Sequence, residues 1–194
     1  MTEYQLDHAT AADVPDIVRI VNGAYRGQDG VAGWTSEAGL IAGQRTDAAQ
    51  VAALVAGDNP VVLVMRERPS ERVVATICLD QLEPERTELG MLSVDVTLQG
   101  GGAGKRLVAL TEDYLLARGV TRACMTVVHA RAELIAWYGR QGYLPTGATV
   151  AFPYDDPSVG QPLRDDLHFV VLEKQLAWLP HCSVCLTMFE AFMH

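Results

Sequence analysis

The stretch of residues 92–107 reads LSVDVTLQGGGAGKRL and joins two different patterns of side chains. Its first half alternates between apolar and polar side chains, which is typical of a half-buried strand. Four glycines follow between residues 100 and 104, and then Leu107, Leu110 and Tyr114 recur at helical spacing. Glycines lose much conformational freedom when they are ordered, so a run of them between a strand and a helix needs a reason. The stretch therefore predicts a strand, a binding loop and a helix.

The spacing of the glycines excludes the two common nucleotide-binding loops. A Walker loop needs glycine where Gln99 stands and Ser or Thr where Arg106 stands. A dinucleotide fingerprint needs a third glycine where Lys105 or Leu107 stands. The remaining interpretation is a phosphate site, because bare amides at a helix N-terminus bind anions. Residues 99–141 support it with six basic against three acidic side chains, and a tight turn without a ligand is the alternative.

Periodicity around this stretch predicts a mixed α/β fold. We expect strands at 4–8, 61–66, 72–82, 87–96, 123–128, 143–152 and 166–172. We expect helices at 14–25, from 34–37 onward, at 47–56, from the glycines to 118, and at 131–141. The strand–loop–helix–strand unit across 87–128 makes its two strands parallel neighbours. The predicted fold is a mostly antiparallel sheet with one parallel strand pair and helices on both faces.

The composition bounds the class of protein. The chain has 194 residues, 49% of them hydrophobic, with a net charge of −9 and a pI of about 4.9. Nucleic-acid and anionic-membrane partners need clustered Lys and Arg, so neither is expected, whereas the acid excess leaves room for a cationic acceptor. The N-terminus lacks a secretory signal and no apolar run could span a membrane, so we expect a cytoplasmic protein.

Residues 1–175 are expected to form one domain, with an apolar C-terminal extension at 176–194. Cys182 and Cys185 lie in that extension, but no second cysteine pair completes a zinc site, so no metal is expected. The extension could add to the core, pack on a second subunit of a homodimer, or be foreign to the domain. The sequence leaves these alternatives open.

The residues 92–107 resemble the acetyl-CoA motif of the GCN5-related N-acetyltransferases (GNAT), whose core is Gln/Arg-x-x-Gly-x-Gly/Ala. Gln99, Gly102 and Gly104 match that core. Residues 131–143, RAELIAWYGRQGY, resemble the second signature of the family, a helix that bears Tyr followed by Gly and an aromatic residue. The family often has Pro where Val96 stands and Asn where Arg131 stands. The resemblance covers about residues 3–175.

The resemblance implies a fold in which the parallel strand pair splays apart and acetyl-CoA binds as cosubstrate. The pyrophosphate would lie on the amides of the glycine loop, and the pantetheine arm along the opened strand edge. A freed amide, that of Val94, would polarise the thioester carbonyl. The expected cofactor-binding residues are Leu92, Val94, Gln99, Gly100, Gly101, Gly102, Ala103, Gly104, Lys105, Arg131 and Tyr138.

Direct transfer to an amine also needs a base and a donor to the departing thiolate. Glu88, in the strand that leads into the loop, is the candidate base, with Asp95 as a weaker alternative; a solvent-facing Glu88 is equally compatible with the pattern. The resemblance implies that Tyr138 is the thiolate donor. A phenol is a weaker acid than a thiol, so its first use is a hydrogen bond to the developing thiolate.

Acceptor recognition leaves the weakest signal in the sequence. Tyr25, Arg26 and Trp34 surround a glycine-broken loop and are the expected acceptor-binding residues, together with Tyr154 in the last hairpin. We expect an N-acetyltransferase that moves an acetyl group from acetyl-CoA directly to a small-molecule amine. The alternatives are an acetyltransferase acting on a protein amine and a non-catalytic acyl-CoA-binding sensor module.

Overall fold

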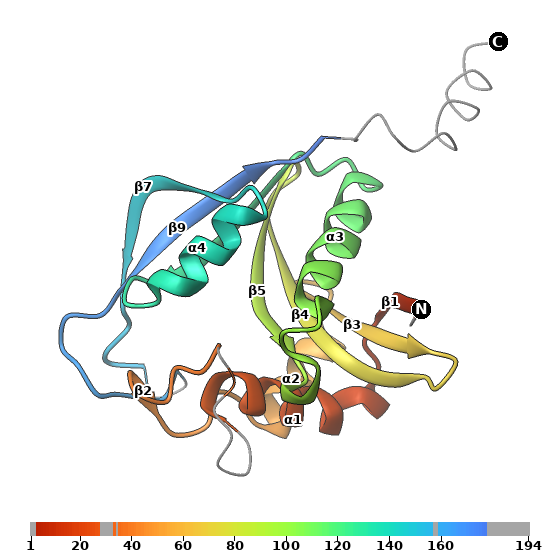
Figure 1. Ribbon diagram of the computed structural model, residues 1–194, viewed down its shortest axis with the longest axis horizontal. Helices are drawn as coiled ribbons and strands as arrows, with labels where there is room; N and C mark the ends of the chain where they lie inside the picture. The colour runs from red at the N-terminus through yellow and green to blue at the C-terminus, as the bar shows by residue number, and fades with distance from the viewer. Residues whose placement is uncertain (1–2, 28–32, 34, 157–158, 178–194) are drawn as a thin grey trace.

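The computed structural model describes residues 3–27, 33, 35–156 and 159–177. A seven-stranded mixed sheet, in the order β1-β3-β4-β5-β6-β9-β7, runs through the centre (Figure 1). Its strands are β1 (Glu3–His8), β3 (Val61–Arg68), β4 (Arg72–Glu83), β5 (Arg86–Val94), β6 (Arg122–Val128), β7 (Leu144–Ala151) and β9 (His168–Gln175). Only β5 and β6 pair in parallel, whereas every other neighbouring pair in this sheet is antiparallel. The predicted fold class is confirmed.

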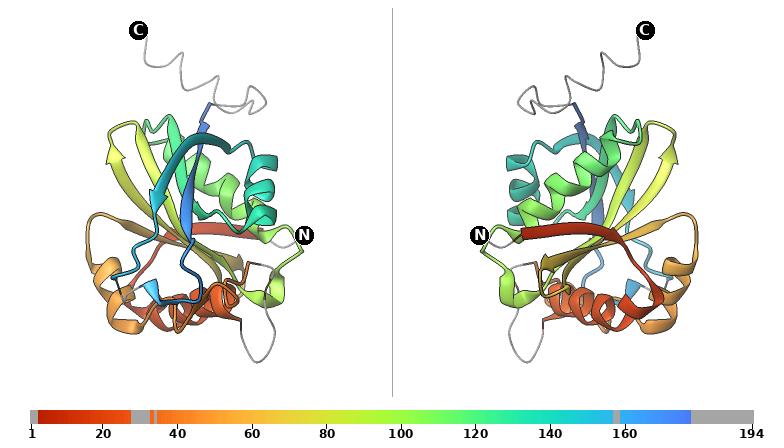
Figure 2. Two further views of the ribbon diagram at one scale, coloured as in Figure 1. Left: turned by 90° about the vertical axis from the view of Figure 1, so that its left-hand side faces the viewer. Right: turned by 90° about the vertical axis from the view of Figure 1, so that its right-hand side faces the viewer.

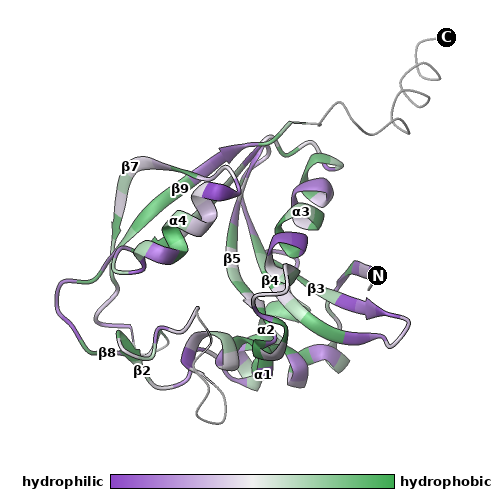
Figure 3. Cartoon of the chain, viewed as in Figure 1, coloured by the Kyte–Doolittle hydropathy of each residue, from purple (hydrophilic) through white to green (hydrophobic). Residues whose placement is uncertain are grey.

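Helices cover both faces of the sheet because alternate strand residues point to opposite sides. α1 (Val14–Arg26) and α2 (Ala48–Ala56) pack against a cluster that includes Val62 and Val64 of β3. α3 (Ala103–Leu116) and α4 (Ala132–Arg140) belong to the other face, whose larger cluster includes Leu63 and Met65. Figure 2 shows the two helix layers on either side of the sheet, and Figure 3 shows apolar colour concentrated in its central strands.

The parallel strands β5 and β6 separate after a short ladder. Their pairing runs only from Arg86–Arg122 to Glu88–Cys124. Further along, β5 carries one residue more than β4 between the Thr76–Ser93 and Cys78–Gly90 pairs, and Met91 there has a φ of 50°. Such a bulge bends a strand and is found next to active sites. The bend directs β5 away from β6, and Figure 1 shows β5 diverging from β9, the other neighbour of β6 in the sheet.

The expected helix at 34–37 is wrong. Residues 35–46 form turns and the short strand β2 (Ile41–Ala42), which pairs with β8 (Gln161–Pro162). The Thr35 hydroxyl donates to the Ala24 carbonyl, and the Glu37 amide donates to the Tyr25 carbonyl. These groups satisfy the orphan carbonyls at the end of α1, so the segment caps one helix instead of starting another. Trp34 and residues 178–194, with Cys182 and Cys185, lie outside the described residues.

No helix in the described parts of the chain is long and apolar enough to cross a membrane.

Candidate active site

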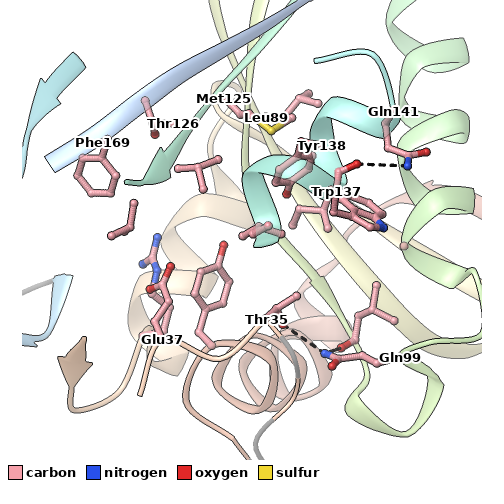
Figure 4. Close-up of a pocket in the computed structure, with 18 of the residues that line it drawn as sticks. Thr35, Glu37, Leu89, Gln99, Met125, Thr126, Trp137, Tyr138, Gln141 and Phe169 are labelled. Carbon is pink, nitrogen blue, oxygen red and sulfur yellow. Dashed lines mark hydrogen bonds between the residues drawn. The ribbon is translucent and has the colours of Figure 1, made fainter. Parts of the chain in front are cut away.

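A cavity of about 570 Å³ occupies the opening between β5 and β6 (Figure 4). Its walls come from the glycine loop (residues 99–105) and α4 on one face of the sheet, and from the loop after α1 on the other. The cavity therefore passes through the sheet where the two strands have separated. One ligand can enter from each face and meet the other between the strands.

Backbone conformation explains the glycines of this loop. Gly100 and Gly102 have φ values of 82° and 86°, a region that costs other residues energy. Gly102 is the N-cap of α3, so the turn presents bare amides at a helix N-terminus beside the cavity. Gly104, in the first turn of α3, faces Trp137 and Val94, which a Cβ atom would contact at 3.5 and 3.7 Å. The arrangement fits a phosphate-bearing ligand whose chain continues toward β5.

The predicted cofactor residues divide into those that line the cavity and those that do not. Lining residues are Leu92, Val94, Gln99, Gly100, Gly102, Gly104, Lys105 and Tyr138. Gly101 does not line it, and Ala103, 3% exposed, belongs to the core. Arg131 does not line it either, because its guanidinium turns toward the loop after α1 and donates to the Thr35 carbonyl at 2.7 Å.

Gln99 connects the glycine loop to both neighbouring segments. Its side-chain amide donates to the Val94 carbonyl at 3.4 Å and to the Thr35 hydroxyl at 3.3 Å. A Cβ atom on Gly33 would come within 2.6 Å of its Oε1 atom, so Gln99 packs directly on that glycine. The side chain holds the loop after α1 against the end of β5.

Tyr138 of α4 lies at the middle of the cavity (Figure 4). It is 6% exposed, and its ring meets those of Trp137 and Tyr143 edge-on at centroid distances of 5.0 and 6.1 Å. Burial raises the pKa of Tyr138 well above its usual value, and the nearby Tyr25 raises this pKa further. The phenol is therefore protonated at neutral pH and can act as a hydrogen-bond donor.

Glu88 does not line the cavity, but its partner does. The hydroxyl of Thr126 on β6 donates to Glu88 Oε1 at 3.0 Å, and Thr126 lines the cavity. The pair lies where the β5–β6 ladder ends, next to the Glu88–Cys124 register pair. Because a hydroxyl both donates and accepts, Thr126 can connect the carboxylate to a ligand between the strands.

The carboxylate of Asp95 is held by hydrogen bonds and ion pairs within the protein. Burial would raise its pKa, but hydrogen bonds from Thr97 and Arg19 outweigh that effect and lower the pKa to about 2. Its carboxylate accepts from the Thr97 hydroxyl at 2.7 Å and pairs with Arg19 at 2.8 Å and Arg72 at 3.4 Å. A carboxylate held in this way is a poor proton acceptor, so Asp95 is unsuited to act as the base.

We call the part of the cavity beyond the strand opening the acceptor end, formed by Tyr25, Glu37, Ile41, Arg45, Phe152, Val159 and Phe169. Glu37, whose exposed fraction is 8%, is the one acidic residue among the described residues that line the cavity. Arg26 and Arg131 approach its carboxylate at 3.3 and 3.8 Å. Burial raises the pKa of Tyr25, and Glu37 raises it further, so this phenol also keeps its proton.

The expected acceptor residues are distributed unevenly. Tyr25 lines the acceptor end, whereas Arg26 lies behind it and donates to the carbonyls of Gly43 and Val159. Tyr154 belongs to a separate hollow, and its hydroxyl accepts from the Leu167 amide at 2.6 Å. Trp34 lies outside the described residues.

Sequence reasoning missed Glu37, Arg45, Thr126, Phe152 and Phe169. Thr126 carries a detectable signal, since it is a polar residue inside an otherwise apolar strand. The others come from separate loops and strands, and no spacing in the sequence joins them. Among the described residues no three His, Cys, Asp or Glu side chains form a group that could hold a metal ion.

A protein-family model and several solved structures are similar to this chain. The model of the acetyltransferase (GNAT) family matches residues 31–143. The ribosomal-protein-S18-alanine N-acetyltransferase of Escherichia coli is similar with 14% identity and a TM-score of 0.63, covering 92% of this chain and 97% of that chain. The structure of yncA from Salmonella typhimurium with its cofactor acetyl-CoA gives 19% identity, a TM-score of 0.63 and coverage of 94% and 99%.

A chimera of spermidine N-acetyltransferase SpeG from Vibrio cholerae and hSSAT gives 10% identity, a TM-score of 0.63 and coverage of 89% and 95%. At these identities each likeness shows the fold alone. No curated protein sequence matches the chain.

Proposed function

This chain belongs to the acetyltransferase (GNAT) family, and from that premise we propose that it transfers an acetyl group from acetyl-CoA directly to a small-molecule amine. The observation that carries the proposal is the single cavity that passes between β5 and β6, with the glycine loop at one end and the acceptor end at the other. Both substrates can then be bound at once, with their reacting atoms between the strands.

The residues that would hold acetyl-CoA follow from the lining of the cavity. Gly100 to Lys105 offer amides and the dipole of α3 to the pyrophosphate. Leu92 and Val94 lie on the stretch of β5 that has left the β6 ladder, so their amides can face a pantetheine arm, whereas the Val94 carbonyl already accepts from Gln99. The Val94 amide is the proposed oxyanion donor. Arg131 is left out of this set, because its side chain binds Thr35 and Glu37 and its main-chain amide and carbonyl bond Val128 and Ile135.

We infer that Glu88 acts as the base through Thr126. The acceptor arrives as an ammonium ion and has to lose a proton before its nitrogen can attack the thioester. Thr126 can accept a hydrogen bond from the nitrogen, or from a water on it, while donating to Glu88 at 3.0 Å. The proton then ends on the Glu88 carboxylate, outside the reacting space.

Tyr138 is the proposed donor to the sulfur. Acetyl-CoA supplies the activated acyl group as a thioester. A phenol is a weaker acid than a thiol, and burial raises the pKa of Tyr138 further, so the phenol hydrogen-bonds the developing thiolate and keeps its own proton. The sulfur takes the proton that the nitrogen sheds once the C–N bond has formed. A hydrogen bond that strengthens as negative charge develops stabilises the transition state more than the ground state.

The acceptor end favours a compact acceptor over a protein chain. The β2–β8 pair joins the loop after α1 to the segment between β7 and β9, and Ile41 of β2 lines the cavity. Phe152 and Phe169 stack at 5.4 Å beside it. This wall supports a small amine, and an extended peptide would have to pass around it.

The test is thiol release from acetyl-CoA against a panel of amines, with the intact chain, Tyr138→Phe and Tyr114→Phe. Tyr114 is the matched control, a tyrosine of α3 whose hydroxyl binds His8 and which does not line the cavity. We expect amine-dependent release that falls roughly 100-fold in Tyr138→Phe and is unchanged in Tyr114→Phe. Tight acetyl-CoA binding without release from any amine would instead identify a non-catalytic acyl-CoA-binding module.

A further inference from the structure

The acceptor end holds an arginine that has no carboxylate partner among the described residues. Arg45 lines the cavity with its guanidinium over the Tyr25 ring, 5.4 Å from the centroid. No carboxylate of the described residues lies within ion-pair distance of it, whereas nine other arginines of that part of the chain are paired with carboxylates. The planar fork of a half-buried guanidinium that no carboxylate neutralises is suited to bind an anion.

The carboxylate of Glu37, which also lines the acceptor end, is already paired with two arginines. Glu37 lies between Arg26 and Arg131, whose side chains are as buried as its own, each 10% exposed. The guanidinium groups of Arg26, Arg45 and Arg131 all influence Tyr25 electrostatically, whereas Glu37 is the one acidic residue among the described residues that line the cavity. The local excess of positive charge opposes the binding of a purely cationic acceptor.

The backbone around Arg45 is fixed in advance. The side chain of Asn22 on α1 accepts from the Arg45 amide at 2.7 Å and the Thr46 amide at 3.3 Å, and it donates to the Thr46 carbonyl at 2.9 Å. The Tyr25 ring supports the guanidinium plane from the same helix. An anion bound there would therefore cost little reorganisation of the loop.

We propose that Arg45 binds the carboxylate of the acceptor, so that the acceptor is an α-amino acid with an apolar side chain. This inference rests on the proposed function and names its substrate class. Ile41, Phe152 and Phe169 offer an apolar surface to that side chain, while Thr126 lies toward the strand opening, where the amine has to react. The positive surroundings also lower the pKa of the bound ammonium, which helps it to lose its proton.

Matched acceptors test the inference. Apolar α-amino acids (alanine, valine, leucine, methionine and phenylalanine) are each compared with their primary amides, which keep the shape but lose the negative charge. The amide has the less basic amine and is intrinsically the easier nucleophile to deprotonate. A preference for the free acid must therefore come from the protein.

We expect the intact chain to favour at least one free acid over its amide by roughly 10- to 100-fold in kcat/KM, as a charged hydrogen-bond pair provides. Arg45→Gln should abolish this preference by raising KM for the acid much more than KM for its amide. Arg45→Lys should retain part of the preference, because the charge remains and the bidentate fork is lost. Acetyl-CoA affinity and thermal stability of both variants should match the intact chain.

Arg118→Gln is the matched control. Arg118 also lies over a tyrosine ring, 3.5 Å from the Tyr114 centroid, without a carboxylate partner among the described residues, and it does not line the cavity. Its replacement should leave the preference unchanged. Equal or better turnover of amides in the intact chain, or an acid preference that survives Arg45→Gln, would overturn the inference while the transferase stands. No thiol release with any acid, amide or simple amine would overturn both.

Discussion

The connection from Thr126 to Glu88 yields the sharpest prediction about catalysis. If Glu88 takes the acceptor's proton through the Thr126 hydroxyl, either Glu88→Gln or Thr126→Val interrupts the same step. General base catalysis contributes roughly 100- to 10,000-fold, so each variant should lose at least 100-fold in kcat at neutral pH. Thr126→Ser, which keeps the hydroxyl 3.0 Å from the carboxylate, should lose less than about tenfold.

The double variant Glu88→Gln with Thr126→Val shows whether the two residues act on one proton-transfer path or on two separate ones. Groups that act in series are not additive, so Glu88→Gln with Thr126→Val should be no slower than the slower single variant. Thr126 is an exposed side chain, and its replacement should change the free energy of unfolding by less than about 0.5 kcal/mol. The assay is steady-state thiol release across pH, with acetyl-CoA affinity as the control for binding. Full activity of Thr126→Val beside an inactive Glu88→Gln would refute the relay, and full activity of both would place the base elsewhere.

Three further predictions concern stability. Gly102→Ala should lower the free energy of unfolding by about 1 kcal/mol because residue 102 has a φ of 86°. Gly139→Ala, on the exposed face of α4, should raise it by about 0.5 kcal/mol. Equal effects of the two substitutions in chemical denaturation would contradict this conformational explanation. Asp95→Asn should lower the free energy of unfolding by about 2 kcal/mol at neutral pH. Folding lowers the pKa of Asp95 from 3.8 to about 2, so the ionised carboxylate stabilises the folded state at every pH above about 4. That difference should shrink as pH falls from about 4 to 2, and a difference independent of pH would show that charge is not its source. Glu37→Gln should lower the free energy of unfolding by about 3 kcal/mol because it removes the carboxylate that pairs with the buried Arg26. Glu133→Gln, at an exposed position in the first turn of α4, should lower it by less than about 1 kcal/mol in thermal unfolding.

Features encoded by neighbouring residues could be predicted from the sequence. The alternation before Gln99 and the glycines after it gave the strand, the loop and α3, because local conformational preference and periodicity dictate each. The same holds for α4, whereas Tyr138 was singled out by the resemblance of its motif and not by periodicity. The parallel β5–β6 pair followed from the handed crossover between them.

Features that depend on distant contacts could not be predicted. Gly90 and Met91 give no strong bulge signal, although the bulge bends β5 away from its partner. Residues 34–37 look like a helix start, but the end of α1 recruits Thr35 and Glu37 for its own carbonyls. Glu88 was visible as a strand carboxylate, yet its link to the cavity through Thr126 required knowing that the ladder ends beside them.

Charge gives the clearest case of a global property that differs from a local one. The chain carries −9 overall, which left room for a cationic acceptor. Folding brings Arg26 and Arg131 to the carboxylate of Glu37 and places Arg45 over the ring of Tyr25, although long stretches of sequence separate them. Net charge governs solubility and long-range steering, whereas the sign of a pocket depends on the few groups whose field is least screened by water. An acidic protein can therefore offer positive ends to both of its substrates, the phosphates at the glycine loop and the carboxylate at Arg45.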